Sequence, residues 1–396
     1  MNLIYLDNAA TTPVHPEVET AMRPYFCKKY GNPSGVYQIS LENKSVIENV
    51  REQIAKTLHA SAEEIYFTSG GTESDNWAIK GAARALKEKG RHIITSKIEH
   101  HAVLNSCAYL EKQGFEVTYL NVDERGSIRP DAIKKAIRKD TILISIMYAN
   151  NEVGTIQPAA QIGKIAKKNG ILFHTDAVQA YGHLSIDVKK ENINLLSASA
   201  HKFNGPKGVG FLYIGKNVLL PACIHGGKQE KNHRAGTENV PGIVGMGKAA
   251  EIAFAMREQR EKQIQQLRNN LIERLQREIP YCRLNGSRTK RLAGNCNISF
   301  QFVEGNELLL LLDEKNICAS AASACSTGNA SPSHVLTAMG VPANLARGTL
   351  RLTIGYQNTP EEIAYTVECI KKAVKKLREN AEDYRRYKET FPCNVK

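Results

Sequence analysis

The stretch Ser197-Ala-Ser-Ala-His-Lys202-Phe-Asn-Gly-Pro-Lys-Gly-Val-Gly210 decides the fold prediction. It follows the apolar run 193–196 and precedes the run 211–214, so we predict a glycine-rich loop between two buried strands. Lys202 then lies where the first strand ends. A lysine at the edge of an α/β sheet is partly removed from water, which favours its neutral amine and suits it to form a Schiff base with a carbonyl cofactor. The alternative is a solvated loop lysine, and other parts of the chain decide between the two.

Strand-like runs alternate with helical or loop segments through the first half of the chain. They are residues 64–68, 92–95, 116–120, 142–148, 171–174, 193–196 and 211–214. This pattern predicts an α/β fold with a mostly parallel seven-stranded sheet between layers of helices. Ligands of such sheets bind beyond the carboxyl ends of the strands. Polar residues follow several of these strands, which predicts one active site there: His100, Asn150, Asn151, Asp176, Gln179, Ser199, His201 and Lys202.

A second glycine-rich turn, Ser69-Gly-Gly-Thr-Glu-Ser-Asp-Asn76, joins the strand at 64–68 to a predicted helix. A strand, a glycine turn and a helix start in this order leave backbone N–H groups free at a positive helix end, which suits a phosphate group. An ordinary helix cap is the alternative. No Gly-Lys-Ser/Thr follows, so the turn is not a Walker loop.

A lysine, a carboxylate and a phosphate cup are the parts that a pyridoxal phosphate site requires. Asp176 follows a buried strand and is placed to keep the pyridine nitrogen protonated, although a helix N-cap is the alternative. Gln179 could donate to the ring hydroxyl, and His100 could stack on the ring or move protons. His100 and His101 are adjacent and lack the i,i+4 spacing of metal ligands on a helix, so we predict no metal site there.

The second half of the chain predicts a smaller α+β unit. Residues 248–279 contain no glycine or proline, so we expect one helix of about 48 Å linking two domains. Strands at 295–302 and 350–354 and helices at 306–313 and 361–387 follow. The N-terminal segment is too short to fold alone and is expected to pack near this unit. We therefore predict a large domain of residues 16–258 and a small domain of residues 1–15 with 259–396.

Charge, cysteine spacing and apolar content limit the partners, the metal sites and the compartment that we expect. The formal charge of +13 comes from 53 basic and 40 acidic residues, partly in the basic helical stretch 371–378, which is read as solvated surface rather than a docking site. Nine cysteines without C-x-x-C spacing argue against a disulfide framework or a zinc site. No apolar stretch approaches the ~20 residues of a membrane span, so we expect a cytoplasmic protein that binds neither membranes nor nucleic acid directly.

Many motifs of the chain resemble those of the cysteine desulfurases, which are fold-type I pyridoxal phosphate enzymes of the class V aminotransferase group. The resemblance runs nearly from end to end. The motifs are Tyr5-Leu-Asp-Asn-Ala-Ala-Thr-Thr12, Gly31-Asn-Pro-Ser34, Thr68-Ser-Gly-Gly-Thr-Glu-Ser-Asp-Asn76, Glu99-His100, Asn150-Asn-Glu-Val-Gly154, Asp176-Ala-Val-Gln179, Ser199-Ala-His-Lys202, Arg234-Ala-Gly-Thr237 and Ser323-Ala-Cys325.

The resemblance implies a role for each matching residue. Lys202 would hold the cofactor, Asp176 would pair with the pyridinium nitrogen, and Gln179 with the ring oxygen. His100 would stack on the ring, and Asn151 would contact cofactor and substrate. Thr237 would reach in from a second subunit of a homodimer, and the phosphate would also be held by Gly71, Thr72, Ser199 and His201.

By the same resemblance, Cys325 is the nucleophile, on a loop of small residues at about 318–332. Such a loop would let the thiol reach the substrate sulfur and then carry a persulfide outward. Cys318 is the rival cysteine, and we predict that it belongs to the core. Arg351 matches the arginine that would clamp the substrate carboxylate bidentately.

The implied reaction converts L-cysteine to L-alanine and leaves a persulfide on Cys325. Lys202 abstracts the α-proton, and His100 or nearby cations could lower the pKa of the Cys325 thiol. The sulfur would pass to an iron–sulfur scaffold protein or to an acceptor for tRNA thiolation, and Cys325 could transiently ligate an iron–sulfur cluster. A selenocysteine lyase or a cysteine lyase that releases free sulfide is the alternative.

Overall fold

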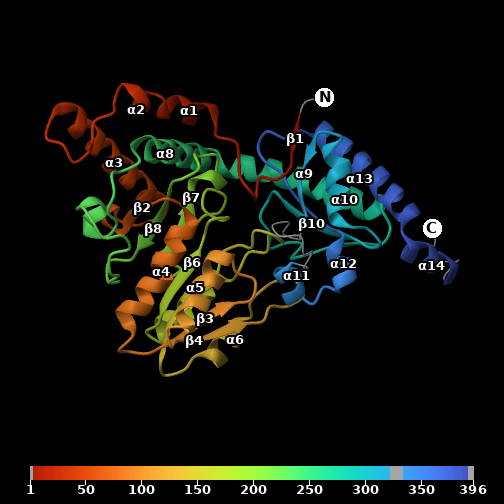
Figure 1. Ribbon diagram of the computed structural model, residues 1–396, viewed down its shortest axis with the longest axis horizontal. Coiled ribbons are helices and arrows are strands. Elements are labelled where there is room, and N and C mark those ends of the chain that lie inside the picture. Colours follow the sequence, from red (N-terminus) through yellow and green to blue (C-terminus); the bar gives the residue numbers. More distant parts are fainter. Residues whose placement is uncertain (1–2, 322–332, 391–396) are drawn as a thin grey trace.

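The structure is a computed structural model that describes residues 3–321 and 333–390. A seven-stranded sheet and its helices form one part of the molecule, and a four-stranded sheet with its own helices lies beside it (Figure 1). The seven strands lie in the order β2-β8-β7-β6-β5-β3-β4. Their bounds are β2 Ile65–Thr68, β3 His92–Ser96, β4 Glu116–Leu120, β5 Thr141–Ser145, β6 Leu172–Asp176, β7 Leu195–Ser199 and β8 Gly210–Ile214.

Strand β8 is antiparallel to its two neighbours, β2 and β7, and all other pairs in this sheet are parallel. The predicted mostly parallel seven-stranded sheet is therefore confirmed. Strands β3, β5, β7 and β8 are buried at every position, because helices cover both faces of the sheet. Along β7, for example, Leu195 packs into the core on one face and Leu196 into the core on the other.

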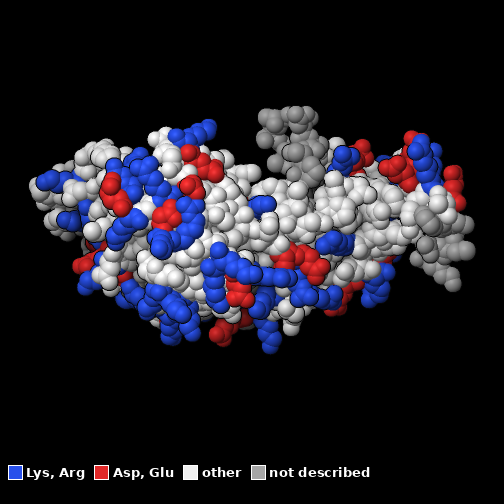
Figure 2. All heavy atoms as spheres, turned by 90° about the horizontal axis from the view of Figure 1, so that it is seen from below, with Lys and Arg blue, Asp and Glu red and all other residues white. Residues whose placement is uncertain are grey.

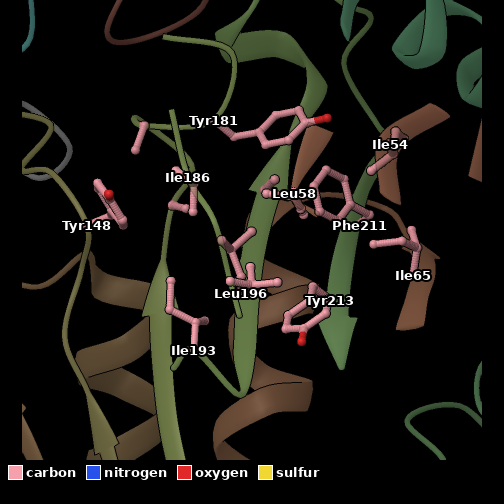
Figure 3. Packing of buried hydrophobic residues seen from close by; sticks show 14 of the residues in the cluster. Ile54, Leu58, Ile65, Tyr148, Tyr181, Ile186, Ile193, Leu196, Phe211 and Tyr213 are labelled. Carbon is pink, nitrogen blue, oxygen red and sulfur yellow. The ribbon is translucent and has the colours of Figure 1, made fainter. Parts of the chain in front are cut away.

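Two helices, α4 and α5, cover one face of this sheet, and α3, α6, α7 and α8 contribute to the core on the other face. Figure 3 shows the core on the face covered by α3, α6, α7 and α8, in which Tyr181, Leu196 and Phe211 pack together. The helices of this part are α1 Pro16–Met22, α2 Pro24–Cys27, α3 Gln38–Thr57, α4 Gly71–Leu86, α5 His101–Glu111, α6 Pro130–Ala136, α7 Ala159–Lys168 and α8 Val240–Ala255, with short 3₁₀ turns η1 Ala62–Glu64, η2 Ala200–Lys202 and η3 Gln229–Asn232.

The four-stranded sheet is antiparallel, in the order β12-β13-β10-β9, and has a separate apolar core. The N-terminal strand β1 pairs in parallel with β11 beside it, which confirms that the N-terminal segment packs near this unit. The elements are β1 Ile4–Tyr5, α9 Arg257–Glu278, β9 Cys282–Leu284, β10 Asn295–Phe300, α10 Gly305–Asp313, β11 Ile317–Cys318, β12 Ser320–Ala321, α11 His334–Ala338, α12 Ala343–Arg347, β13 Thr349–Thr353, α13 Pro360–Asn380 and α14 Glu382–Thr390.

Two long helices predicted from the sequence are each broken in the structure. The helix predicted at 248–279 is divided between α8 and α9, because Met256 leaves the helical conformation with φ −110° and ψ 7°. The buried face of α8 packs in the core of the large sheet and that of α9 in the core of the small sheet, so one straight helix could not serve both. The helix predicted at 361–387 breaks at Ala381, after which Tyr384 and Tyr387 pack on Phe302.

Lysine and arginine side chains are interspersed with aspartate and glutamate over the face that Figure 2 shows. Within residues 3–321 and 333–390, none of the helices combines the length and the apolar character needed to cross a bilayer. The same residues contain no group of three or more His, Cys, Asp or Glu side chains that could hold a metal ion.

Candidate active site

A cavity of about 400 Å³ lies at the carboxyl ends of the parallel strands. It is lined by ten of the residues predicted from the sequence: Gly71, Thr72, His100, Asn151, Asp176, Gln179, Ser199, His201, Lys202 and Arg351. In the sequence these residues extend from Gly71 to Arg351, a distance of 280 positions. The parallel strands bring them together because each strand delivers its following loop to the same edge of the sheet.

Lys202 ends the short turn η2 that follows β7. Its Nζ donates to the carbonyl oxygens of Ala9 and Ala10, each at 2.6 Å. Burial lowers the pKa of Lys202 to about 8, and the nearby positive charge of Arg351 acts in the same direction. The neutral amine, which attack on a carbonyl group requires, is therefore far more accessible near neutral pH than in an ordinary lysine, whose pKa is about 10.5.

Asp176 is the last residue of β6 and is buried. Burial raises the pKa of its carboxyl group, but the Val178 N–H, which donates to Oδ1 at 2.9 Å, and the nearby charge of Lys202 favour the ionised form. The negative charge of Asp176 is therefore supported by a backbone donor and by a nearby cation.

Two further buried acids lie near Asp176. Asp75 also lines the cavity, and its Oδ1 has no hydrogen-bond partner in the described part of the chain. Burial and the charge of Asp176 hold the pKa of Asp75 well above its usual range, and burial raises the pKa of Glu99 to about 8. His174 cannot neutralise Asp75, since burial lowers the pKa of this histidine to about 3.

The two cavity histidines are neutral near neutral pH. His100 is the N-cap of α5, and its Nδ1 accepts the Ala102 N–H at 3.1 Å, so a proton on the neutral ring belongs on Nε2. Burial lowers the pKa of His100, and it lowers the pKa of His201 to about 4. His201 Nδ1 lies 3.1 Å from Thr11 Oγ1, which leaves its other ring nitrogen to interact with a ligand.

The turn before α4 provides backbone donors. Gly70 is the N-cap with φ 150°, and no side chain among the described residues makes the capping hydrogen bond. A Cβ on Gly71 would lie 2.5 Å from Val178 Cγ2, so only glycine fits this approach of the helix to the β6 loop. The free N–H groups at this helix start and the neighbouring Ser199 form a cup that suits a phosphate group.

Arg351, on β13, is the contribution of the small sheet to the cavity. Its Nη2 donates to Asp7 Oδ1 at 2.9 Å and to Ser320 Oγ at 3.0 Å, and Nη1 donates to the Asn151 carbonyl at 3.3 Å. Its Nε is buried and has no partner among residues 3–321 and 333–390. The guanidinium group is therefore held in place and retains a donor for an anion.

Some predicted residues lie elsewhere. Thr237 lines a separate hollow of about 210 Å³ beside β2, not this cavity. Asn150 is fully buried and holds its own turn by accepting the Glu152 and Val153 N–H groups. Cys318, predicted as core, is only partly buried, because the short strand β11 lies at the edge of its unit. Cys325 and most of its loop lie outside the described residues.

Sequence reasoning missed two contacts of Lys202. The first is the pair of carbonyl groups from the N-terminal segment, for which the Asn8-Ala-Ala-Thr motif was the available signal. The second is His183, whose Nε2 lies 3.0 Å from the Lys202 carbonyl and whose Nδ1 lies 3.0 Å from Glu261 Oε1. Both ring nitrogens face acceptors, which favours the protonated ring. Burial opposes this charge, but the Glu261 carboxylate outweighs it and raises the pKa of His183.

Comparisons with known proteins agree with this geometry. The model of the aminotransferase class-V family matches residues 4–365. A protein of Methanosarcina thermophila named cysteine desulfurase IscS is 58% identical over 375 residues, which cover 95% of this chain and 93% of that protein. The solved structure of a NifS-like protein is 39% identical with a TM-score of 0.89 and covers 95% of this chain and 100% of its own. SspA in complex with cysteine is 40% identical with a TM-score of 0.79, covering 90% and 100%.

The fold and the cavity are those of a fold-type I pyridoxal phosphate enzyme. More narrowly, the chain belongs to the aminotransferase class-V family, and the resemblance to the cysteine desulfurases is confirmed. The residues present fit the cofactor, because one cavity combines a lysine of lowered pKa, a buried carboxylate and a helix start with free N–H groups.

Proposed function

We propose that this protein is a pyridoxal phosphate-dependent cysteine desulfurase that converts L-cysteine to L-alanine and collects the sulfur on Cys325. The observation that carries the proposal is the single cavity in which Lys202, Asp176 and Arg351 meet. The activity is that named for the Methanosarcina thermophila relative, and cysteine is the molecule named in the SspA structure.

The cavity residues would hold the cofactor at three points. Lys202 would carry it covalently, Asp176 would keep the pyridine nitrogen protonated, and the phosphate would be bound by Gly71 and Thr72 at the helix start with Ser199 and His201. When bound, pyridoxal phosphate supplies an electron sink that makes the α-proton of an amino acid acidic. His100 would cover one face of the ring, and Gln179 would turn its amide from Ala9 toward the ring oxygen.

The chain's own groups would then bind the substrate and move its protons. Arg351, held by Asp7, would bind the carboxylate of L-cysteine together with Asn151. Lys202, once released from the cofactor, would take the α-proton as a neutral amine, which its lowered pKa favours. The Cys325 thiolate would attack the substrate sulfur, forming the S–S bond of a persulfide as the C–S bond breaks.

Cys325→Ser tests the proposal, with Cys318→Ser as the matched control. We expect alanine and sulfide formation from L-cysteine to fall to background in the Cys325 variant, while the visible absorbance of the cofactor remains. The Cys318 variant should keep its activity, since this side chain is partly buried on β11 and burial raises its pKa. Desulfurase activity retained by Cys325→Ser would remove Cys325 from the mechanism.

A selenocysteine lyase or a cysteine lyase that releases free sulfide is the alternative of the same fold. Product analysis without a reductant distinguishes them. A desulfurase leaves one sulfur per active site on the protein, whereas a lyase releases sulfide continuously.

The active form that we propose is a homodimer with shared active sites. Thr237 is exposed and lies outside the cavity of its own chain, so its proposed contact with a phosphate requires a second subunit. Large apolar side chains are also exposed around α2 and the start of α3, which suits a dimer contact: Phe26, Tyr30, Val36, Tyr37 and Leu41. A solution mass of one chain in the active enzyme would rule this out.

The sulfur acceptor that we propose is an iron–sulfur scaffold protein or a protein of tRNA thiolation in the cytoplasm. The IscS name of the relatives supports a sulfur-transfer role. Capture of partners after loading with labelled cysteine would identify the acceptor. We also propose the division into residues 16–258 and residues 1–15 with 259–396, which the two separate apolar cores support.

A further inference from the structure

The loop that carries Thr237 contains an unusual backbone conformation. Glu230, Lys231 and Asn232 are consecutive residues with positive φ values of 43°, 58° and 67°. A non-glycine residue with a positive φ is strained and persists only where surrounding contacts impose this conformation. Two ion pairs of this loop provide such contacts.

The first anchor of the loop is the Glu230 carboxylate. Arg51 of α3 binds it with Nη1 to Oε2 at 2.7 Å and Nη2 to Oε1 at 2.9 Å, and the Phe67 N–H of β2 donates to Oε2 at 2.9 Å. The side chains of Arg51 and Glu230 are each only 4% exposed. This buried, bidentate pair fixes the strained segment to the edge of the seven-stranded sheet.

The second anchor joins the loop to the phosphate cup. Arg234 donates from Nε to Glu73 Oε1 at 2.8 Å and from Nη2 to Oε2 at 3.2 Å. Glu73 is in the first turn of α4, directly after Gly71 and Thr72, and also accepts from the N–H and Oγ of Ser69. Burial opposes ionisation, but the hydrogen bonds from Arg234 and Ser69 outweigh it and lower the pKa of Glu73. The ion pair is therefore charged near neutral pH.

Thr237 follows the second anchor by three residues. Ala235 between them is buried, Gly236 has φ 112°, and Asn239 caps α8 by accepting the Gly242 N–H. The segment that presents Thr237 is thus held at Arg234 on one side and at α8 on the other. Its side chain remains exposed at the molecular surface.

We propose that Arg234 and Glu73, supported by Arg51 and Glu230, are positioning residues that hold Thr237 for the cofactor phosphate of a second copy of this chain. The inference rests on the proposed homodimer in which Thr237 completes the partner's site. It adds a role for two motif residues, Arg234 and Glu73, that the proposed mechanism leaves unused. Because Thr237 would act on the other subunit, loss of Arg234 should weaken the cofactor site of the partner more than its own.

Mixed dimers of two differently tagged full-length chains test this. One chain carries Lys202→Ala, so the dimer has one site able to hold the cofactor covalently, and the Thr237 that would complete it belongs to the Lys202→Ala chain. Arg234→Gln is placed either in the Lys202→Ala chain or in the competent chain. Cofactor affinity of the competent site is measured by its visible absorbance during dialysis, together with desulfurase activity.

With Thr237→Ala in the Lys202→Ala chain, we expect the competent site to lose about 10-fold or more in cofactor affinity, since the lost hydrogen bond is to a charged group. Arg234→Gln in that same chain should reproduce most of this loss, and Arg234→Lys should restore part of it by keeping the charge. Arg234→Gln in the competent chain should have the smaller effect.

The shared site and the positioning role of Arg234 are tested separately. If Thr237→Ala in the Lys202→Ala chain has no effect, the shared site is wrong and the inference falls with it. If Thr237→Ala weakens the competent site but Arg234→Gln acts only from within the competent chain, the site is shared and Arg234 merely supports its own phosphate cup, which overturns the inference.

Discussion

At the amino end of the seven-stranded sheet, Glu64 is 3% exposed and fully supported: Lys189 Nζ lies 2.5 Å from Oε1, and the backbone N–H groups of Ser61 and Lys216 donate to the same carboxylate. Burial opposes its ionisation, but these donors lower the pKa of Glu64. At the carboxyl end, Asp75, Glu99 and Asp176 are equally buried, yet the pKa of each is raised.

This difference shows which end of the sheet is built for stability and which for chemistry. A buried carboxyl group without a cation costs stability, so folding alone gives no reason to place Asp75 and Glu99 beside Asp176. Asp75 and Asp176 line one cavity with Lys202, and titratable groups of shifted pKa gather at catalytic sites. Exchanging equivalent side chains at the two ends should therefore have opposite effects on activity and on stability.

The largest contrast is expected between two lysines, Lys202 at the carboxyl end and Lys189 at the amino end. Lys202→Ala removes the amine that would carry the cofactor and move the α-proton, so kcat should fall by about 10²–10⁴-fold. Lys189→Ala should leave kcat unchanged and lower the unfolding temperature, because it leaves Glu64 without its cation. Steady-state kinetics and calorimetry of both variants measure this, and equal kinetic losses would contradict the comparison.

The second contrast applies one chemical change, carboxyl to amide, at each end. Asp176→Asn removes the charge that would pair with the pyridine nitrogen. Since hydrogen bonds to charged groups are worth about 1.5–3 kcal/mol, cofactor affinity should weaken about 10- to 150-fold. Glu64→Gln should cost stability without changing cofactor affinity. Cofactor dissociation constants from absorbance titrations separate the two, and a loss of affinity in Glu64→Gln would show that the amino end is not purely structural.

A smaller effect separates the two properties of Arg351, its positive charge and the paired N–H donors of its planar guanidinium group. Arg351→Gln should raise KM for L-cysteine about 10-fold or more, because the donor to the substrate carboxylate is lost. Arg351→Lys should raise KM less, since it keeps the charge but not the paired donors. Asp7→Asn is the matched comparison, because it removes the charge that holds Nη2 and leaves the guanidinium group in place. A change confined to kcat in both arginine variants would contradict a carboxylate clamp.

Local sequence patterns predicted the seven strands and the residues at their carboxyl ends, because alternation of strands and helices implies parallel strands that share one sheet edge. They could not predict the breaks at Met256 and Ala381, which depend on where each helix finds its core rather than on helix propensity. The predicted strands at 142–148 and 295–302 likewise extended too far, because β5 ends at Ser145 and β10 ends at Phe300.

Within the candidate site, residues with a chemical signature next to a strand were predictable, as Lys202 and Asp176 were. Contacts made by backbone atoms were not, and the Ala9 and Ala10 carbonyls that bind Lys202 come from the other end of the chain. Asn150 was predicted for the site but does not line the cavity. It follows a strand as its neighbour Asn151 does, but its side-chain amide donates to the Ile98 carbonyl and accepts the Glu152 N–H. Sequence position alone could not tell which of the two faces the cavity.

The smallest effect concerns the pH dependence of stability. The pKa of Glu99 is about 8 in the folded protein, against 4.5 ordinarily, so the folded state keeps a proton that the unfolded state has lost across this range. The stability attributable to Glu99 is thus complete below about pH 4.5 and is lost as the pH rises toward 8, by at most about 1.4 kcal/mol per pH unit. Glu99→Gln cannot lose this proton. Its unfolding temperature relative to the native protein should therefore rise from pH 5 to pH 8, whereas that of Glu64→Gln should stay constant, because the lowered pKa of Glu64 lies below this window. Calorimetry at four pH values suffices, and a flat difference for Glu99→Gln would mean that this carboxyl group is ionised throughout and that the two ends of the sheet do not differ as argued.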